Sequence, residues 1–196
     1  MDNTQLILAL YENQMIKFGE FTLKSGKKSY IYADIRTAIS YPNIFRAICE
    51  RFNQLLSGLS YDHICGVPYS ALTFASAIAY TNGTPMLLKR KEAKEYGTKK
   101  MLEGVFSPNQ SVVLIEDVVT TGASILETTA VLEDFRLEVK DICVLIERNQ
   151  GGQELLENMG YKVHSIMDLY QIIDVLHTAN KITAEEKTMA LNSMKL

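Results

Sequence analysis

Cysteine and histidine are scarce in this chain of 196 residues, which has three of each. The cysteines Cys49, Cys65 and Cys143 lie far apart, each within an apolar stretch, so we expect buried thiols in a reducing compartment. Neither the cysteines nor the histidines have the spacing of a metal-ligand set. The sequence therefore predicts neither a disulfide-stapled secreted domain nor a zinc site.

Long apolar runs are missing as well. No stretch approaches the ~20 apolar residues needed to span a bilayer, and residues 1–18 lack the basic region and cleavage site of a secretory signal. The chain has four prolines, no low-complexity segment and no repeat of fixed period, which argues against disorder and against a solenoid. We expect a single domain over residues 1–196, in the cytoplasm and with no membrane contact.

Positive charge is confined to one segment. The net charge is −3, but Lys89–Lys100 has six basic and two acidic residues, so this segment is +4 and the remainder is −7. A single basic segment on an acidic chain favours a small polyanionic ligand over nucleic acid. A charge run of this kind is also common on a solvated surface, so the segment alone leaves both interpretations open.

Apolar patterns that are typical of strands alternate with helical ones along the chain. We expect strands at His63–Val67, Pro85–Leu88, Val112–Ile115, Asp141–Ile146 and Val163–Ile166. We expect helices at Ile7–Phe18 (N-cap Asn3 or Thr4), Pro42–Leu56, Ser70–Tyr80, Ala123–Phe135, Gln153–Met159, Asp168–Thr178 and Thr183–Met194. This alternation predicts an α/β fold with a central, mostly parallel twisted sheet flanked by helices. Ligands of such sheets bind beyond the carboxyl ends of the strands.

The segment VVLIEDVVTTGAS, residues 112–124, is the sharpest motif. A buried strand is followed by two carboxylates, Glu116 and Asp117, and then by a hydroxyl-rich turn with one glycine, Gly122. Unpaired N–H groups at the start of the next helix suit a phosphate monoester, and the carboxylates suit ribose hydroxyls. No lysine follows the glycine, so this is not the P-loop of nucleotide triphosphatases. A plain surface turn with a capping threonine is the alternative.

These thirteen residues resemble the phosphoribosyl-pyrophosphate signature of type I phosphoribosyltransferases. Three further segments resemble orotate phosphoribosyltransferases in the same order: FTLKSGKKSYIYAD (21–34), KRKEAKEYGTKKMLEG (89–104) and LIERNQGG (145–152). The likeness covers nearly the whole chain and is closest to the orotate transferase half of bifunctional UMP synthases. It implies a hood with the N-terminal helix at about 1–40, a core at about 41–170 and C-terminal helices at about 168–196.

The resemblance implies a function and a set of site residues. The chain would transfer the phosphoribosyl group of phosphoribosyl pyrophosphate (PRPP) to N1 of orotate, giving orotidine 5′-monophosphate and pyrophosphate. Residues implied at PRPP are Lys24, Tyr69, Arg90, Lys91, Lys94, Tyr96, Glu116, Asp117, Val118, Val119, Thr120, Thr121, Gly122, Ala123 and Ser124. Residues implied at orotate are Lys24, Tyr32, Thr120 and Arg148, and those implied in catalysis are Lys24, Lys91 and Asp117.

The family also implies Mg²⁺ as cofactor and a homodimer in which residues 90–100 complete the partner's site. The metal would be held mainly through PRPP, with Glu116 or Asp117 contributing through water. Two departures from the family stand out: Tyr96 replaces the histidine of many bacterial members, and Tyr30 replaces a proline. We expect a monofunctional protein, because a fused decarboxylase barrel needs roughly 200 further residues.

Two other functions remain open at this point. A phosphoribosyltransferase for another base would keep residues 112–124 but have no use for Lys24 and Arg148, which suit an anionic base. Arg148 taken alone could equally form a surface ion pair. A regulator that senses PRPP and binds nucleic acid would show a basic stripe or an added DNA-binding segment, and neither is present in the sequence.

Overall fold

The computed structural model describes residues 1–22, 26, 28–91 and 101–194. The strands of its central sheet are β3 (His63–Gly66), β4 (Met86–Lys89), β5 (Leu102–Glu103), β6 (Ser111–Val119), β7 (Glu138–Glu147) and β8 (Lys162–Asp168). In the described part of the chain they lie in the order β5-β4-β3-β6-β7-β8. All neighbours are parallel except β5, which pairs antiparallel with β4 at the edge. The predicted mostly parallel sheet is confirmed.

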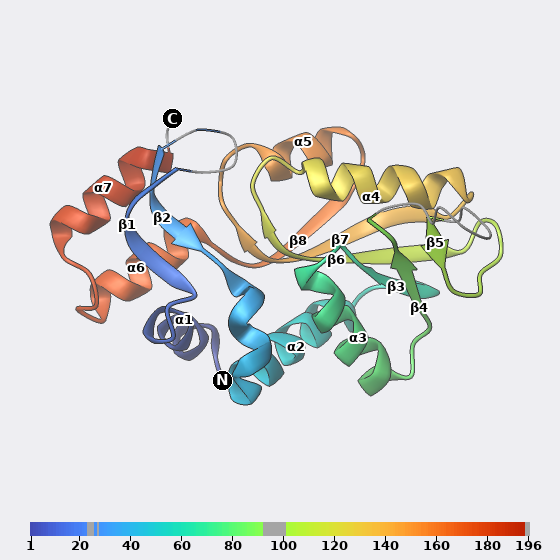
Figure 1. The fold of residues 1–196 in the computed structure, drawn as a ribbon, viewed down its shortest axis with the longest axis horizontal. Coiled ribbons are helices and arrows are strands. Elements are labelled where there is room, and N and C mark those ends of the chain that lie inside the picture. The colour runs from blue at the N-terminus through green and yellow to red at the C-terminus, as the bar shows by residue number, and fades with distance from the viewer. Residues whose placement is uncertain (23–25, 27, 92–100, 195–196) are drawn as a thin grey trace.

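Helices cover both faces of this sheet (Figure 1). One face is covered by α4 (Ala123–Asp134) and α5 (Gly152–Asn158). The helices on the other side are α1 (Asn3–Glu12), α2 (Pro42–Leu56), α3 (Ser70–Asn82) and α6 (Leu169–Thr178). Side chains of β6 therefore alternate between two apolar cores. Val113 and Ile115 join the core of α2, α3 and α6, whereas Val112 and Leu114 join that of α4 and α5. Burial on both faces explains the continuous apolar run of this strand.

A two-stranded antiparallel hairpin forms the predicted hood beside the sheet. It consists of β1 (Ile16–Thr22) and β2 (Lys28–Ala33), and a 3₁₀ helix, η1 (Ile35–Ser40), leads from it to α2. The C-terminal helix α7 (Ala184–Met194) packs against the hairpin, where the Ser193 hydroxyl accepts a hydrogen bond of 3.0 Å from the backbone N–H of Tyr30. Segments near the two ends of the sequence thus lie in contact at the hood.

The first helix is shorter than predicted. It ends at Glu12, Gln14 adopts a positive φ of 60°, and β1 has begun by Ile16, so the expected helix to Phe18 is wrong. The apolar spacing continues past the helix because the following strand is buried as well. The N-cap is Asp2, whose carboxylate accepts the N–H of Gln5 at 2.8 Å. None of the described helices is long and apolar enough to cross a bilayer.

The direction in which the chain adds strands to the sheet reverses between β3 and β6. From β3 the chain continues outward through α3 to β4, and from β6 it continues the other way through α4 to β7. Gly66, the last residue of β3, pairs with Ile115, while β6 runs on through Glu116 to Val119. The polar end of β6 therefore lies at the switch point of the sheet, where ligands of open α/β sheets bind.

Candidate active site

The turn between β6 and α4 has the shape that the sequence predicts for a phosphate site. Gly122 takes a positive φ of 78°, and a Cβ there would lie 3.3 Å from Leu156 and 3.4 Å from the carbonyl of Gly152. The first N–H groups of α4 have no partner within the helix. Thr121, Ala123 and Ser124 are exposed around this turn. The turn therefore presents hydroxyls and N–H donors to solvent at the positive end of a helix.

The start of α5 supports this turn from behind. A Cβ at Gly152 would lie 2.6 Å from the carbonyl oxygen of Thr120 and 3.0 Å from the nitrogen of Gly122. Backbone thus packs on backbone with no room for a side chain. Gly122 in the turn and Gly152 beneath it therefore set the position of residues 120–124, called the phosphate turn below.

The two carboxylates lie within β6 rather than beyond it, which corrects the prediction that the strand ends at Ile115. Glu116 is 5% exposed, and burial together with the neighbouring Asp117 raises the pKa of its carboxyl group. Its side chain accepts the N–H of Asp117 at 3.0 Å, and the Asp117 side chain accepts that of Val118 at 3.0 Å. Asp117 is only partly buried. Of the pair, Asp117 is therefore the carboxylate that is open to a ligand in solution.

Arg148 follows β7 directly and connects the sheet with the hood. Its backbone N–H donates to the carbonyl of Val119 at 3.1 Å, at the edge of the phosphate turn. Its guanidinium donates to the Ser29 hydroxyl and to the carbonyl of Ile31, both at 3.2 Å, in β2. The side chain is buried, its Nε finds no acceptor among the described residues, and burial lowers its pKa. A buried cation with a free donor is suited to a carboxylate ligand.

Tyr32 lies in β2 of the hood, directly after Ile31, whose carbonyl accepts a hydrogen bond from Arg148. The Tyr32 ring stacks on Phe21, with 5.2 Å between the ring centres. Arg36 forms a bidentate pair with Asp34 and also feels the charge of Asp117. The pKa of Asp34 is lowered by this arginine. Arg148 and Tyr32 are thus joined through β2, whereas the grouping of both with Asp117 around one substrate stays a prediction.

Arg36 was missed by sequence reasoning. It follows the first family motif in YADIR, so the signal was a cation four residues after the aromatic Tyr32 and two after Asp34. Sequence alone does not show that the charge of Asp117 contributes, after that of Asp34, to raising the pKa of this cation. The Asp34 carboxylate caps the 3₁₀ helix by accepting the N–H of Arg36, and the same carboxylate holds the Arg36 guanidinium.

A cavity of about 470 Å³ lies where β3 and β4 end. Tyr69 is 65% exposed, and the Lys91 ammonium lies 5.2 Å from the centre of its ring. Arg90 pairs with Glu103 at 2.9 Å, and its Nε has no acceptor in the described part of the chain. The remaining lysine, Lys89, is buried and paired with Glu127. The positively charged side chains of this cavity suit a diphosphate group.

Some predicted residues lie outside the description or contribute only backbone. Lys24, Lys94 and Tyr96 fall outside the described residues. Val119 is buried, so only its backbone borders the site, whereas Val118 and Thr120 are partly exposed. Within the described ranges, no group of three His, Cys, Asp or Glu side chains is arranged to hold a metal ion.

A mostly parallel sheet flanked by helices, with a glycine turn, a partly buried carboxylate and two groups of cations near its strand ends, defines an α/β protein whose site offers donors to anionic groups. Residues 37–175 match the family model of the phosphoribosyl transferase domain. The chain is 39% identical over 191 residues to an orotate phosphoribosyltransferase of Caenorhabditis elegans, covering 95% of this chain and 83% of the relative.

Longer relatives match over the same region. The chain is 42% identical over 182 residues to the uridine 5′-monophosphate synthase of Bos taurus, covering 92% of this chain and 38% of the relative. A structure of Leishmania donovani UMP synthase superposes with a TM-score of 0.90 at 34% identity, covering 98% of this chain and 42% of that one. The chain thus spans about two fifths of these synthases. It belongs to the phosphoribosyltransferase family, among the orotate phosphoribosyltransferases.

Proposed function

We propose that this chain catalyses the transfer of the phosphoribosyl group of PRPP to N1 of orotate, releasing pyrophosphate. The observation that supports this most is the buried guanidinium of Arg148, which lies beside the phosphate turn and near Tyr32. Its planar fork suits a carboxylate, and orotate has one where uracil, adenine and hypoxanthine have none. The base pocket would therefore favour an anionic base.

The phosphate turn and the cavity beside Tyr69 suit different parts of PRPP. The 5′-phosphate would bind Thr120 to Ser124, where hydroxyls and N–H groups converge at the start of α4. Asp117 would accept hydrogen bonds from the ribose hydroxyls. The pyrophosphate would lie over Tyr69, in the cavity at the ends of β3 and β4. Lys91 and Arg90 would reach it from the other subunit, as in the homodimer proposed below. By family likeness, Lys24, Lys94 and Tyr96 would complete these contacts.

Magnesium fits this site without a protein cage. Mg²⁺ keeps several waters and binds through one or two carboxylates plus substrate phosphates, so the lack of a three-residue cluster among the described residues is no obstacle. Asp117 would hold the ion through water, since Glu116 is buried and its pKa is raised. When bound, the ion would act as a Lewis acid on the pyrophosphate.

The protein's own part is to orient both substrates and to stabilise charge. Bond breaking at ribose C1 gathers negative charge on the pyrophosphate, which the ammonium of Lys91 and the guanidinium of Arg90 would offset. Arg148 and Tyr32 would hold orotate with N1 facing C1, which removes much of the entropic barrier. We assign no strong protein base, and Asp117 is a candidate only for handling the N1 proton.

The first test is the loss of orotate absorbance on mixing the protein with PRPP and Mg²⁺, with adenine, hypoxanthine and uracil in parallel. We expect consumption of orotate alone, stopped by chelating the metal. Consumption of another base instead of orotate would refute the role given to Arg148. No reaction with any base, with PRPP still bound, would favour the sensing regulator.

We also propose a homodimer in which residues 90–100 of one subunit reach the site of the other. Lys91, which lines the cavity beside Tyr69, and Asp117, near the end of β6, lie on different segments, so they can be inactivated separately. Mixing inactive Lys91→Ala and Asp117→Asn subunits should restore part of the activity, because some sites regain both groups. A mixture no more active than its parents would contradict shared sites. The single-domain division and the cytoplasmic location stay predictions.

A further inference from the structure

A buried lysine lies at the end of β4, directly before two of the cations that are proposed to bind the pyrophosphate. Lys89 is 3% exposed, and its ammonium group forms an ion pair with Glu127 of α4. The side chain of Glu127 is 66% exposed, so only the cation of this pair has been removed from water. Neither side chain is among the contacts proposed for the substrates.

The stability of the fold does not require a charge at position 89. Side chains alternate along a strand, so Lys89 faces the same side of the sheet as Leu87. Leu87 belongs to the apolar core under α4, together with Ile125 and Leu132. An apolar side chain at position 89 would avoid the cost of removing an ammonium group from water, and proteins in which buried ion pairs are replaced in this way are often equally or more stable. The ion pair therefore points to a role other than stability.

The ion pair joins two segments that carry proposed PRPP contacts. Glu127 lies one helical turn after Ala123, the first residue of α4, and so closely follows the phosphate turn. Lys89 directly precedes Arg90, whose backbone N–H donates to the carbonyl of Met101 at 2.8 Å. The chain at the end of β4 is thus held both by its pairing with β5 and by the bond from Lys89 to α4.

We propose that Lys89 is a positioning residue for PRPP. Its ion pair with Glu127 fixes the end of β4 against α4. The fixed strand end sets the point from which Arg90 and Lys91 extend toward the pyrophosphate. This role rests on the proposed function, because it takes PRPP as the substrate.

A direct electrostatic effect of Lys89 on the pyrophosphate predicts the opposite response to one variant. Glu127→Gln removes a negative charge, so it would strengthen the attraction of a polyanion if Lys89 acted through its charge alone. If the ion pair positions the strand end, the same variant weakens PRPP binding. It also leaves the buried ammonium group without its carboxylate, so the melting temperature should fall.

Variants of Lys89 separate positioning from stability. Lys89→Met leaves only the exposed carboxylate of Glu127 without this partner, so the melting temperature should equal or exceed that of the parent. Its kcat/KM for PRPP should nevertheless fall about 10- to 100-fold, because small displacements of substrate-binding groups lower rates by such factors, whereas KM for orotate should be unchanged. Lys89→Arg keeps a cation at this position and should retain more of the kcat/KM than Lys89→Met. The double variant Lys89→Met/Glu127→Gln should regain the melting temperature lost in Glu127→Gln but not the kcat/KM.

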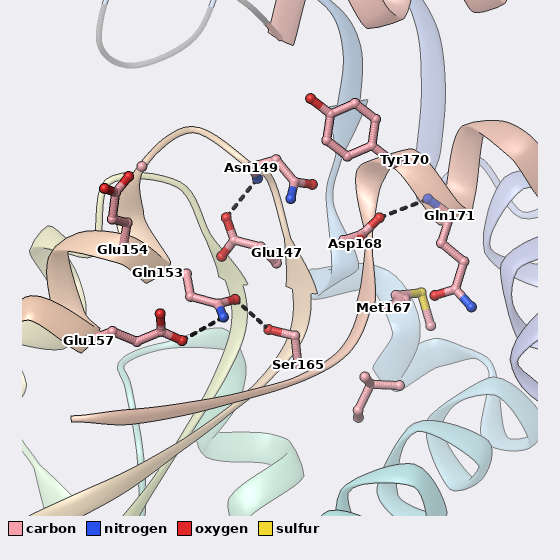
Figure 2. A pocket seen from close by; sticks show the side chains of 12 residues that line it. Glu147, Asn149, Gln153, Glu154, Glu157, Ser165, Met167, Asp168, Tyr170 and Gln171 are labelled. Carbon is pink, nitrogen blue, oxygen red and sulfur yellow. Dashed lines mark hydrogen bonds between the residues drawn. The ribbon is translucent and has the colours of Figure 1, made fainter.

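Two matched controls remove similar charges elsewhere. Lys187→Met breaks the ion pair between α7 and Asp174 of α6, whose side chain is 65% exposed. Glu157→Gln removes a carboxylate from the exposed side of α5, where Figure 2 shows it with Gln153, whose neutral amide donates to it at 2.7 Å. Both controls should leave the kinetics with PRPP unchanged.

Titration calorimetry with PRPP alone separates the positioning role from the proposed reaction. If the parent binds PRPP but consumes no orotate, the proposed function fails, and weaker PRPP binding by Lys89→Met still supports the positioning role. If the parent consumes orotate and Lys89→Met has an unchanged kcat/KM for PRPP, only the positioning role is overturned. Tighter PRPP binding by Glu127→Gln, or a loss of kcat/KM in Lys89→Met that accompanies a lower melting temperature, would also overturn it. A parent that does not bind PRPP would overturn both.

Discussion

Replacing Gly152 by alanine should harm this protein, although helix propensity alone favours the change. Gly152 is the first residue of α5, where alanine would ordinarily be better than glycine by roughly 0.5–1 kcal/mol. A Cβ at this position, however, would lie 2.6 Å from the Thr120 oxygen, 2.9 Å from its carbonyl carbon and 3.0 Å from the Gly122 nitrogen. All three atoms are backbone of the phosphate turn, so no side chain can move aside to make room.

The size of the effect follows from the contact distances. Ordinary contact begins at 3.4 Å, so α5 and the turn must separate by 3.4 − 2.6, or about 0.8 Å. Overpacking of this kind costs about 1–3 kcal/mol. After the propensity gain we expect a net loss of about 1–2 kcal/mol, which lowers the melting temperature by about 2–8 °C. A displacement near 1 Å in a substrate-binding turn lowers kcat/KM for PRPP by up to about 100-fold.

The matched control is Gly58→Ala, which adds the same methyl group after α2. Its nearest neighbour there is the Leu55 oxygen at 4.0 Å, so melting temperature and kinetics should be unchanged or slightly improved. Thermal melts and the orotate absorbance assay, with PRPP varied, measure both variants. A Gly152→Ala protein that is as stable and as active as the parent would refute the inferred packing of α5 under the turn.

Three further changes separate the roles of individual groups. Arg148→Lys replaces a planar fork by a point charge, so steady-state kinetics should show an orotate KM raised about 10- to 100-fold with little change for PRPP; an unchanged orotate KM would contradict the assignment. Tyr69→Leu removes the ring beside Lys91, so KM for PRPP should rise about two- to fivefold, the worth of an exposed cation–π contact, whereas a change confined to orotate would point elsewhere. Burial raises the pKa of Glu116 in the folded state above its ordinary value of 4.5. Between these two pKa values the folded chain binds more protons than the unfolded chain, so the free energy of unfolding falls as pH rises. Glu116→Gln should remove this fall and make the chain more stable than the parent above that pH window. Melting temperatures of variant and parent that change with pH in the same way from pH 4 upward would disprove it.

The sequence predicted the sheet well because its strands are buried on both faces. Continuous apolar runs at β6 and β7 have few alternatives, and the helices between them follow from the alternation. The prediction of the first helix failed at residues 13–18, because the apolar side chains of β1 continue the helical spacing of α1 although they belong to a strand. The two-residue strand β5 was missed because its pairing with β4 is a tertiary event with no periodicity of its own.

The candidate site was predicted mainly through its motifs rather than through local physics. The turn at residues 120–124 could be derived from residue chemistry, and its geometry agrees. The contacts of Arg148 with Ser29 and Ile31 could not, because they join residues more than a hundred positions apart. For the same reason the backbone contact beneath the turn at Gly152 has no signature in the sequence except a second glycine.

The two bonds from Arg148 to the hood have a consequence for how this protein could change its substrate. The side chain proposed to recognise the base also fastens the β1–β2 hairpin to the sheet through Ser29 and Ile31. A lineage that exchanged Arg148 to accept a neutral base would loosen that hairpin in the same step. The proposed preference for an anionic base and the attachment of the hood thus depend on the same side chain. We expect a switch to another base to require a compensating change in β2.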